Sequence, residues 1–218
     1  MKRSAPPLAL SLVILLGLLG PIGCGSFKRF LYEGFGRDEW QAPERVVTTL
    51  ALSPGDEIAD LGSGGGYFTY RFAEAVGKSG KVYALDVDES LLAYIEGQAQ
   101  ERNLPQIVTV HAPEDGLGLP DASVDMIFLS NVYHHLPDPT DYFRGAGSAL
   151  RKGGRLVVVE FRGASFPRGH ATTPGEIRTQ LQAAGYEIID SYDFLEKQSF
   201  QIFRLGDMAD GATNTGDH

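Results

Sequence analysis

Apolar residues follow two alternating patterns between residues 42 and 205. Short continuous apolar runs are typical of buried strands, whereas apolar residues spaced three or four apart mark one face of a helix. Residues 156–159 form a run of the first kind, and Phe68, Phe72 and Val76 show the helical spacing. The predicted strands are 56–61, 81–85, 106–111, 123–129, 155–161, 186–192 and 199–204, and the predicted helices are 43–52, 66–76, 89–101, 140–150 and 173–184.

This strand–helix alternation predicts an α/β fold, because helices that connect parallel strands cover both faces of the sheet. We expect a Rossmann-like, doubly wound sheet that is mostly parallel, with an antiparallel last strand. Asp88 is expected to cap the helix 89–101, and residues 173–176 (Thr-Pro-Gly-Glu) form a capping box. The pair Gly153-Gly154 is expected to end the helix 140–150.

Composition narrows the classes of function. A length of 218 residues with 43% hydrophobic content suits one globular domain with small additional segments. The single cysteine excludes a disulfide framework and a multi-cysteine metal site. A net charge of −9 argues against a broad basic surface, so we expect a small-molecule substrate and no nucleic-acid partner.

The N-terminus has the layout of a secretory signal: Lys2-Arg3, an apolar run over residues 8–20, and a break before Cys24. Residues 21–24 (Pro-Ile-Gly-Cys) resemble the lipobox of bacterial lipoproteins, although that family usually has Leu at the first of these positions. The resemblance implies that Cys24 is lipidated and that the protein is exported and attached to a membrane. The alternative is an uncleaved single-span anchor with the domain facing the cytoplasm.

These observations divide the chain into four parts. We expect residues 1–23 to be a signal peptide or anchor, 24–41 a linker or lid, 42–205 the globular domain and 206–218 a disordered tail. The aromatic residues between positions 27 and 40 are consistent either with a lid over a ligand or with simple packing.

Candidate chemistry begins where the first strand meets the first helix of the sheet, at residues 60–66 (Asp-Leu-Gly-Ser-Gly-Gly-Gly). Glycines at such a turn let the backbone approach a ligand, and Asp86, at the end of the next strand, can accept hydrogen bonds from ribose hydroxyls. The dinucleotide pattern G-x-G-x-x-G would require glycine where Tyr67 stands, and Asp60 would repel a diphosphate. A ligand with an ammonium or sulfonium group fits better, and S-adenosylmethionine carries both.

The segment from Gly36 to Phe203 resembles the class I S-adenosylmethionine-dependent methyltransferases, in the branch that includes quinone-biosynthesis and arsenite methyltransferases. The motifs that carry the resemblance are residues 60–66, Asp86, 113–115, 119–125 and 150–156. The resemblance implies S-adenosylmethionine as cofactor and assigns the cofactor-binding residues. These are Asp60 and Gly62 at the methionine end, Gly64 beside the sugar, Asp86 on the ribose, Val87 on the adenine and Asn131 beside the sulfonium. The family often has an acid facing the adenine where Ala112 stands, and Glu114 or Asp115 is expected to replace it.

The segment Ser130–Pro137 is the second candidate reactive region, since it follows the fourth predicted strand at the same edge of the sheet. Histidine is a natural base near neutral pH, and tyrosine can orient a substrate or donate a hydrogen bond. We expect His134, ahead of His135, to act as a base, with Tyr133 and Asn131 also facing the substrate. The alternative is that the histidine packs structurally. We expect no metal site here, because adjacent histidines point apart and no H-E-x-x-H motif is present.

The hypothesis that accounts for these features is a membrane-tethered methyltransferase acting on a small or lipophilic acceptor. S-adenosylmethionine is made in the cytosol, so an exported domain would lack it. A non-catalytic S-adenosylmethionine- or nucleotide-binding protein of the same fold therefore stays open as an alternative. A dinucleotide-dependent oxidoreductase is less favoured, because of Asp60 and Tyr67.

Overall fold

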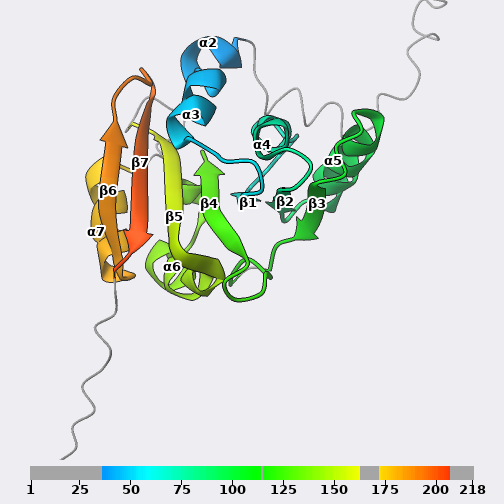
Figure 1. Cartoon of the computed structure of the whole chain (residues 1–218). Helices are drawn as coiled ribbons and strands as arrows, with labels where there is room; N and C mark the ends of the chain where they lie inside the picture. The colour runs from blue at the N-terminus through cyan, green and yellow to red at the C-terminus, as the bar shows by residue number, and fades with distance from the viewer. Residues whose placement is uncertain (1–35, 114, 163–171, 207–218) are drawn as a thin grey trace, which may run out of the picture.

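A computed structural model of the 218-residue chain describes residues 36–113, 115–162 and 172–206. These residues form one seven-stranded sheet in the order β3-β2-β1-β4-β5-β7-β6, with helices on both faces (Figure 1). The strands are β1 (Glu57–Leu61), β2 (Lys81–Asp86), β3 (Ile107–His111), β4 (Val124–Ser130), β5 (Leu150–Phe161), β6 (Tyr186–Tyr192) and β7 (Gln198–Leu205). The helices are α2 (Arg37–Gln41), α3 (Pro43–Leu50), α4 (Thr69–Val76), α5 (Glu89–Glu101), α6 (Pro139–Ala146) and α7 (Pro174–Ala183), with 3₁₀ turns at η1 (Tyr133–His135) and η2 (Gly147–Ala149).

Strands β1 to β5 are parallel, and β7 runs antiparallel to both β5 and β6. The expected fold class, mostly parallel with an antiparallel strand near the C-terminus, is therefore confirmed. The register pairs Leu61 with both Leu85 and Leu129, and it pairs Ser130 with Val159. The carboxyl ends of β1, β2, β4 and β5 consequently meet at one edge of the sheet, where ligands bind in folds of this kind.

The two faces of the sheet carry separate apolar cores, because successive side chains of a strand point to opposite faces. Ile58 and Val157 pack on the face covered by α3 and α4, whereas Ala59 and Val158 pack on the face covered by α6 and α7. Aromatic rings fill the first of these cores, where Phe68 and Phe72 both lie 4.8 Å, centroid to centroid, from Phe128.

Two of the predicted helix signals are confirmed. The Asp88 side chain accepts a hydrogen bond from the Ser90 backbone N–H at the start of α5. Thr173 and Glu176 form the reciprocal capping box that opens α7. Each cap satisfies backbone donors that the first helical turn leaves without partners.

The prediction for Gly153-Gly154 is wrong. Helix α6 ends at Ala146, η2 follows, and β5 already begins at Leu150, so the glycine pair lies inside a strand. The pairing of β4 with β5 jumps there from Val124↔Leu150 to Met126↔Arg155. Gly153 has φ +82°, a conformation that favours glycine, and this bulge produces the glycine signal that resembles a helix stop.

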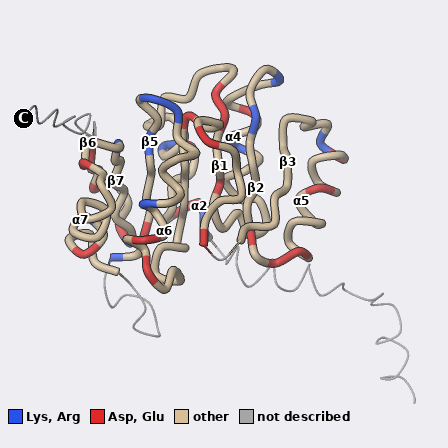
Figure 2. The backbone as a smooth tube through the Cα atoms, turned by 90° about the horizontal axis from the view of Figure 1, so that it is seen from below, with Lys and Arg blue, Asp and Glu red and all other residues tan. Residues whose placement is uncertain are grey.

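Several sequence-based expectations concern residues outside the described ranges. These are the signal or anchor at 1–23, Cys24 and most of the linker 24–41, Glu114, and the tail from residue 207. Among the helices that the structure describes, none is long and apolar enough to cross a membrane. Acidic and basic positions are interspersed along the described backbone in the view of Figure 2.

Candidate functional site at the carboxyl edge of the sheet

The loop after β1 is held against the end of β2 and against the segment that follows β4. The backbone N–H groups of Gly62 and Ser63 both donate to the Leu85 carbonyl, at 2.8 and 3.0 Å. A Cβ atom at Gly62 would lie 2.3 Å from a Val132 methyl group, so a side chain here would force Val132 to move. Gly64 has φ +55° and no atom within 4 Å of an added Cβ, which leaves its backbone facing open space.

Asp86 fixes the open part of this loop. Its Oδ2 accepts the Gly64 N–H at 2.9 Å, and its Oδ1 accepts the Asp88 N–H at 3.0 Å. Each carboxylate oxygen has two lone pairs, so Asp86 can still accept hydrogen bonds from a diol. Val87 follows directly and is 68% exposed, which is unusual for a large apolar side chain in this fold. The arrangement offers a carboxylate and an apolar surface side by side.

Asp60 is buried at the end of β1, with only 3% of the residue exposed. Its Oδ2 accepts a hydrogen bond of 2.6 Å from the Thr69 hydroxyl. Burial raises the pKa of Asp60 to about 7, and Thr69 and the Arg37 guanidinium only partly oppose this effect. A cation bound beside Asp60 would therefore favour the ionised carboxylate.

Helix α2 covers this part of the sheet edge. Gln41 is buried, and its side-chain amide donates to the Ser130 hydroxyl at 2.6 Å. Trp40 stacks on Phe161 with the ring centroids 5.6 Å apart. Of the two expectations for the aromatic segment, packing describes Trp40; the other aromatic residues of that segment lie outside the described ranges.

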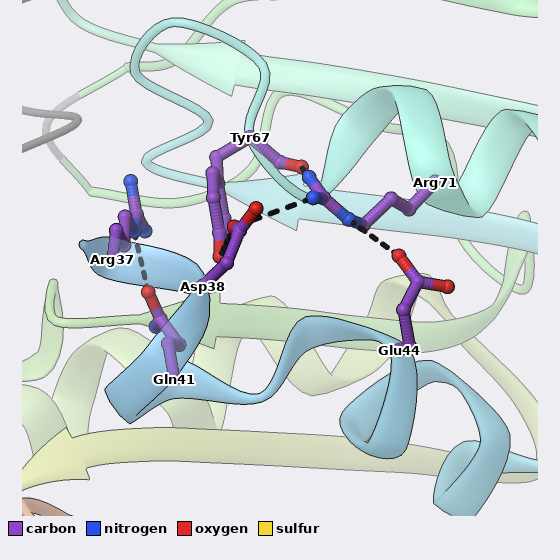
Figure 3. Close-up of polar contacts among 6 residues, drawn as sticks. All are labelled: Arg37, Asp38, Gln41, Glu44, Tyr67 and Arg71. Carbon is purple, nitrogen blue, oxygen red and sulfur yellow. Dashed lines mark hydrogen bonds and ion pairs between the residues drawn. The ribbon is translucent and has the colours of Figure 1, made fainter.

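Tyr67, at the exit of the glycine loop, fastens α2 to the loop (Figure 3). Its hydroxyl donates to Asp38 at 2.5 Å, and its ring lies between the guanidinium groups of Arg37 and Arg71, at 3.7 and 4.5 Å from the ring centroid. Arg71 also pairs with Asp38 at 3.4 Å and with Glu44 at 3.1 Å. The residue that departs from the dinucleotide pattern thus connects the loop with the helix above it.

The segment after β4 places its polar residues in different surroundings. Asn131 has φ +58°, and its Oδ1 accepts a 2.7 Å hydrogen bond from Gln198. Tyr133 is fully buried against Phe143, and its hydroxyl donates to Gln180 at 3.0 Å. Burial also raises the pKa of Tyr133 well above its usual range. This environment is that of a core residue and gives no support to the expected substrate-facing role of Tyr133.

His134 contacts a residue that the sequence did not single out. Its Nδ1 lies 3.0 Å from Oε1 of Glu160, a carboxylate with no exposed surface near the end of β5. The signal in the sequence was a charged residue directly after the apolar run 156–159. Gln41 and Gln198 were missed as well, because neither belongs to a recognisable motif.

The acids expected beside the adenine are not brought to Asp86 by any described contact. Asp115 is exposed on the loop after β3, and Glu114 lies outside the described residues. Ala112 is buried, and its N–H donates to the Asp86 carbonyl at 3.1 Å. Within the described ranges, no group of three or more His, Cys, Asp or Glu side chains is arranged to hold a metal ion.

The sequence is similar to a known protein family and to curated methyltransferases. Residues 59–158 match the family described as "Methyltransferase domain". The chain is 34% identical over 119 residues to the "Ubiquinone/menaquinone biosynthesis C-methyltransferase UbiE" of Pasteurella multocida, which covers 53% of this chain and 44% of that protein. It is 27% identical over 135 residues to a "Demethylmenaquinone methyltransferase" of a Geobacillus strain, covering 62% of this chain and 54% of the relative. The chain thus spans about half the length of these curated relatives.

Solved structures show the same fold. A SAM-dependent methyltransferase from Aquifex aeolicus superposes with a TM-score of 0.76 at 23% identity, covering 83% of this chain and 98% of that one. The methyltransferase CalH, solved with S-adenosylhomocysteine, superposes with a TM-score of 0.62 at 14% identity, covering 84% of this chain and 63% of that one.

Proposed function

We propose that this chain, whose residues 59–158 match a methyltransferase domain, is a class I S-adenosylmethionine-dependent methyltransferase that methylates a small lipophilic acceptor of the quinol type. The matched family and the neighbouring folds use S-adenosylmethionine, which supplies a methyl group on a positively charged sulfur. The acceptor class is suggested by the curated relatives, which are named for quinone biosynthesis. The observation that carries the proposal concerns Gly64. Its N–H donates to Asp86 Oδ2 at 2.9 Å, and the space where a Cβ would lie is open.

The residues at the carboxyl edge fit the cofactor. The glycine loop contains the buried Ser63 hydroxyl, which has no hydrogen-bond partner among the described residues. Asp60 provides a carboxylate for the positively charged methionine end, and Asp86 provides acceptors for the ribose hydroxyls. The further proposed contacts are Gly62 and Gly64 along the backbone, Val87 on the adenine, Asn131 beside the sulfonium, and Glu114 or Asp115 near the adenine.

On the acceptor side, His134 is the proposed base. It lies in the turn η1, at the same edge as the glycine loop, and the Gly62–Val132 contact joins the two segments. Removal of the hydroxyl proton from a quinol raises the electron density of its ring, which favours attack on a methyl group. In-line alignment of the two reactants supplies much of the remaining acceleration.

The proposed location is a membrane surface. The basic start, the apolar run 8–20 and Cys24 would tether the domain through a lipid or through a single-span anchor. A lipophilic acceptor is dissolved in the same membrane, so a tether would hold the enzyme where its substrate is concentrated. The anchored form with the domain facing the cytoplasm gives direct access to S-adenosylmethionine, and the exported form would need an external supply.

The test is calorimetry and methyl transfer with the full-length chain in detergent. We expect S-adenosylhomocysteine to bind, and methyl transfer from S-adenosylmethionine to 1,4-naphthohydroquinone. Asp86→Ala should weaken S-adenosylhomocysteine binding about 10- to 100-fold, the scale of lost hydrogen bonds to a charged group. Asp190→Ala, an exposed aspartate on the edge strand β6, is the matched control and should bind normally.

Three results would contradict the proposal. Unchanged affinity in Asp86→Ala would remove Asp86 from the site. Binding without transfer to naphthohydroquinone or catechol would favour the non-catalytic alternative. Tighter binding of NAD than of S-adenosylhomocysteine would favour the oxidoreductase.

A further inference from the structure

Glu160 is a carboxylate buried near the end of a central strand. None of its surface is exposed, and its Oε1 accepts the Phe161 N–H at 2.9 Å in addition to its contact with His134. Its Oε2 has no hydrogen-bond partner among the described residues. Removing a carboxylate from water is costly unless its hydrogen bonds are replaced, so stability does not account for glutamate at this position.

The contact with Glu160 determines which nitrogen of His134 carries the proton. Burial raises the pKa of Glu160, and His134 and the Phe161 N–H oppose that rise. When Glu160 is ionised its carboxylate only accepts hydrogen bonds, so Nδ1 of His134 is then the donor across the 3.0 Å separation. In the neutral imidazole this leaves the lone pair on Nε2. Within the described part of the chain, His134 makes no hydrogen bond through Nε2, and 9% of its side chain is exposed.

The surrounding elements hold both residues in place. Tyr133, the first residue of η1, is anchored in the core through Phe143 and Gln180, which fixes the turn that carries His134. The Ser199 hydroxyl donates to the Glu160 carbonyl at 3.3 Å across the β5–β7 pairing. The His135 ring lies 4.0 Å from the His134 ring so, contrary to the expectation from the sequence, these adjacent histidines do not point apart. Two neighbouring strands and a buried tyrosine therefore hold the backbone segments that carry Glu160 and His134.

We propose that Glu160 is a positioning residue for methyl transfer, which keeps His134 in the tautomer whose Nε2 can accept the hydroxyl proton of the acceptor. The O–H electron pair of the quinol then increases density at the ring carbon, which forms the bond to the methyl carbon as the carbon–sulfur bond breaks. Bound S-adenosylmethionine would supply the methyl group and keep the electron pair of the broken bond as a neutral thioether. The ring carbon then loses its hydrogen as a proton to water, and His134 returns its proton to the quinol oxygen. This inference rests on the proposed function, and Glu160 lies outside the family match at 59–158.

The experiment compares Glu160→Gln with wild type in the full-length chain. The amide has nearly the shape of the carboxylate, but it can donate to Nδ1 and thereby favour the opposite tautomer. We expect kcat for 1,4-naphthohydroquinone to fall about 100-fold or more, within the range for loss of a general base. KM and the Kd for S-adenosylhomocysteine should change less than about twofold, since the loss is confined to the transition state.

A spectroscopic readout separates positioning from a structural role. Nitrogen-15 spectra of the histidine rings, with His134 assigned from a His134→Gln variant, should show the Nδ1–H tautomer in wild type and the Nε2–H tautomer in Glu160→Gln. Ser199→Ala is the matched control, because it removes a contact to the Glu160 backbone and leaves the carboxylate intact. Glu160→Asp keeps the charge and should restore part of the activity.

An Nε2–H tautomer in wild type would overturn the inference, even if Glu160→Gln failed to fold. Wild-type kcat in Glu160→Gln would overturn it as well, as would equal losses in Ser199→Ala and Glu160→Gln. Failure of the proposed function is visible separately, as absence of S-adenosylhomocysteine binding in the wild-type chain. A chain that binds the cofactor and shows the Nδ1–H tautomer but methylates neither naphthohydroquinone nor catechol would contradict the catalytic role.

Discussion

Cofactor binding should release a proton from Asp60. In the free chain the pKa of this buried carboxyl is about 7, because burial disfavours its charged form. A positively charged methionine end beside Asp60 would favour the carboxylate and lower its pKa towards the ordinary value of 3.8. Binding and ionisation of Asp60 are then linked, so the affinity depends on pH.

The magnitude follows from the titration of a single group. With a pKa of about 7, roughly nine-tenths of Asp60 is protonated at pH 6 and roughly one-tenth at pH 8. Binding should therefore release about 0.9 proton at pH 6 and about 0.1 at pH 8. The Kd for S-adenosylmethionine should fall close to tenfold per pH unit below pH 7 and become nearly constant above it. Arg37 and Asp86, the charged groups that act on Asp60, have opposing effects.

The assay is calorimetry in buffers of different ionisation enthalpy, which reports the number of protons released. Asp60→Asn keeps an oxygen that can accept the Thr69 hydrogen bond but cannot release a proton. The difference between wild type and this variant removes the titration of the ligand's own amine. Equal proton release by both at pH 6 would refute the linkage and show that Asp60 is already ionised or does not contact the cation.

The local geometry supports two further predictions, and the N-terminal sequence supports a third. Tyr133→Phe should cost about 1 kcal/mol of stability through the lost Gln180 hydrogen bond, with kcat nearly unchanged; a large loss of kcat without destabilisation would restore Tyr133 as a substrate-facing residue. Gly62→Ala should destabilise the fold by about 2–4 kcal/mol in urea titrations, because of its positive φ and the 2.3 Å clash with Val132. Gly64→Ala has no such clash, so it should fold with only about 1 kcal/mol of strain and should weaken cofactor binding. Cys24→Ser should abolish labelling by a palmitate analogue if the N-terminus is lipidated, and equal labelling of both forms would favour an uncleaved anchor.

The sequence was sufficient for most of the fold, since its strands and helices satisfy local rules. Continuous apolar runs are buried strands, and Asp88 and Thr173 start helices through hydrogen bonds to residues two or three positions away. The error at Gly153-Gly154 has the same origin, because a glycine pair marks a positive φ without specifying whether it ends a helix or bends a strand. Pairing with β4, which decides between them, is not a local property.

The candidate site was predictable only where it forms a motif. The glycine loop and Asp86 belong to one strand–helix–strand unit and were expected at adjacent strand ends; the structure adds the 2.9 Å contact between Asp86 and Gly64. Glu160 and His134 are 26 positions apart, and Gln41 and Ser130 are 89 apart. Such pairs depend on strand order and register, which bring together residues that share no sequence pattern.

Strand alternation also explains how the two parts of the site are arranged. Asp60 lies two positions after Ile58, on the face covered by α3 and α4, whereas Glu160 lies two positions after Val158, on the face covered by α6 and α7. The proposed cofactor residue Asp60 and the proposed positioning residue Glu160 therefore approach the carboxyl edge from opposite faces of the sheet. A methyl acceptor that contacts both the cofactor and His134 would lie across the ends of β4 and β5. Asn131 and Gln198 form their hydrogen bond there.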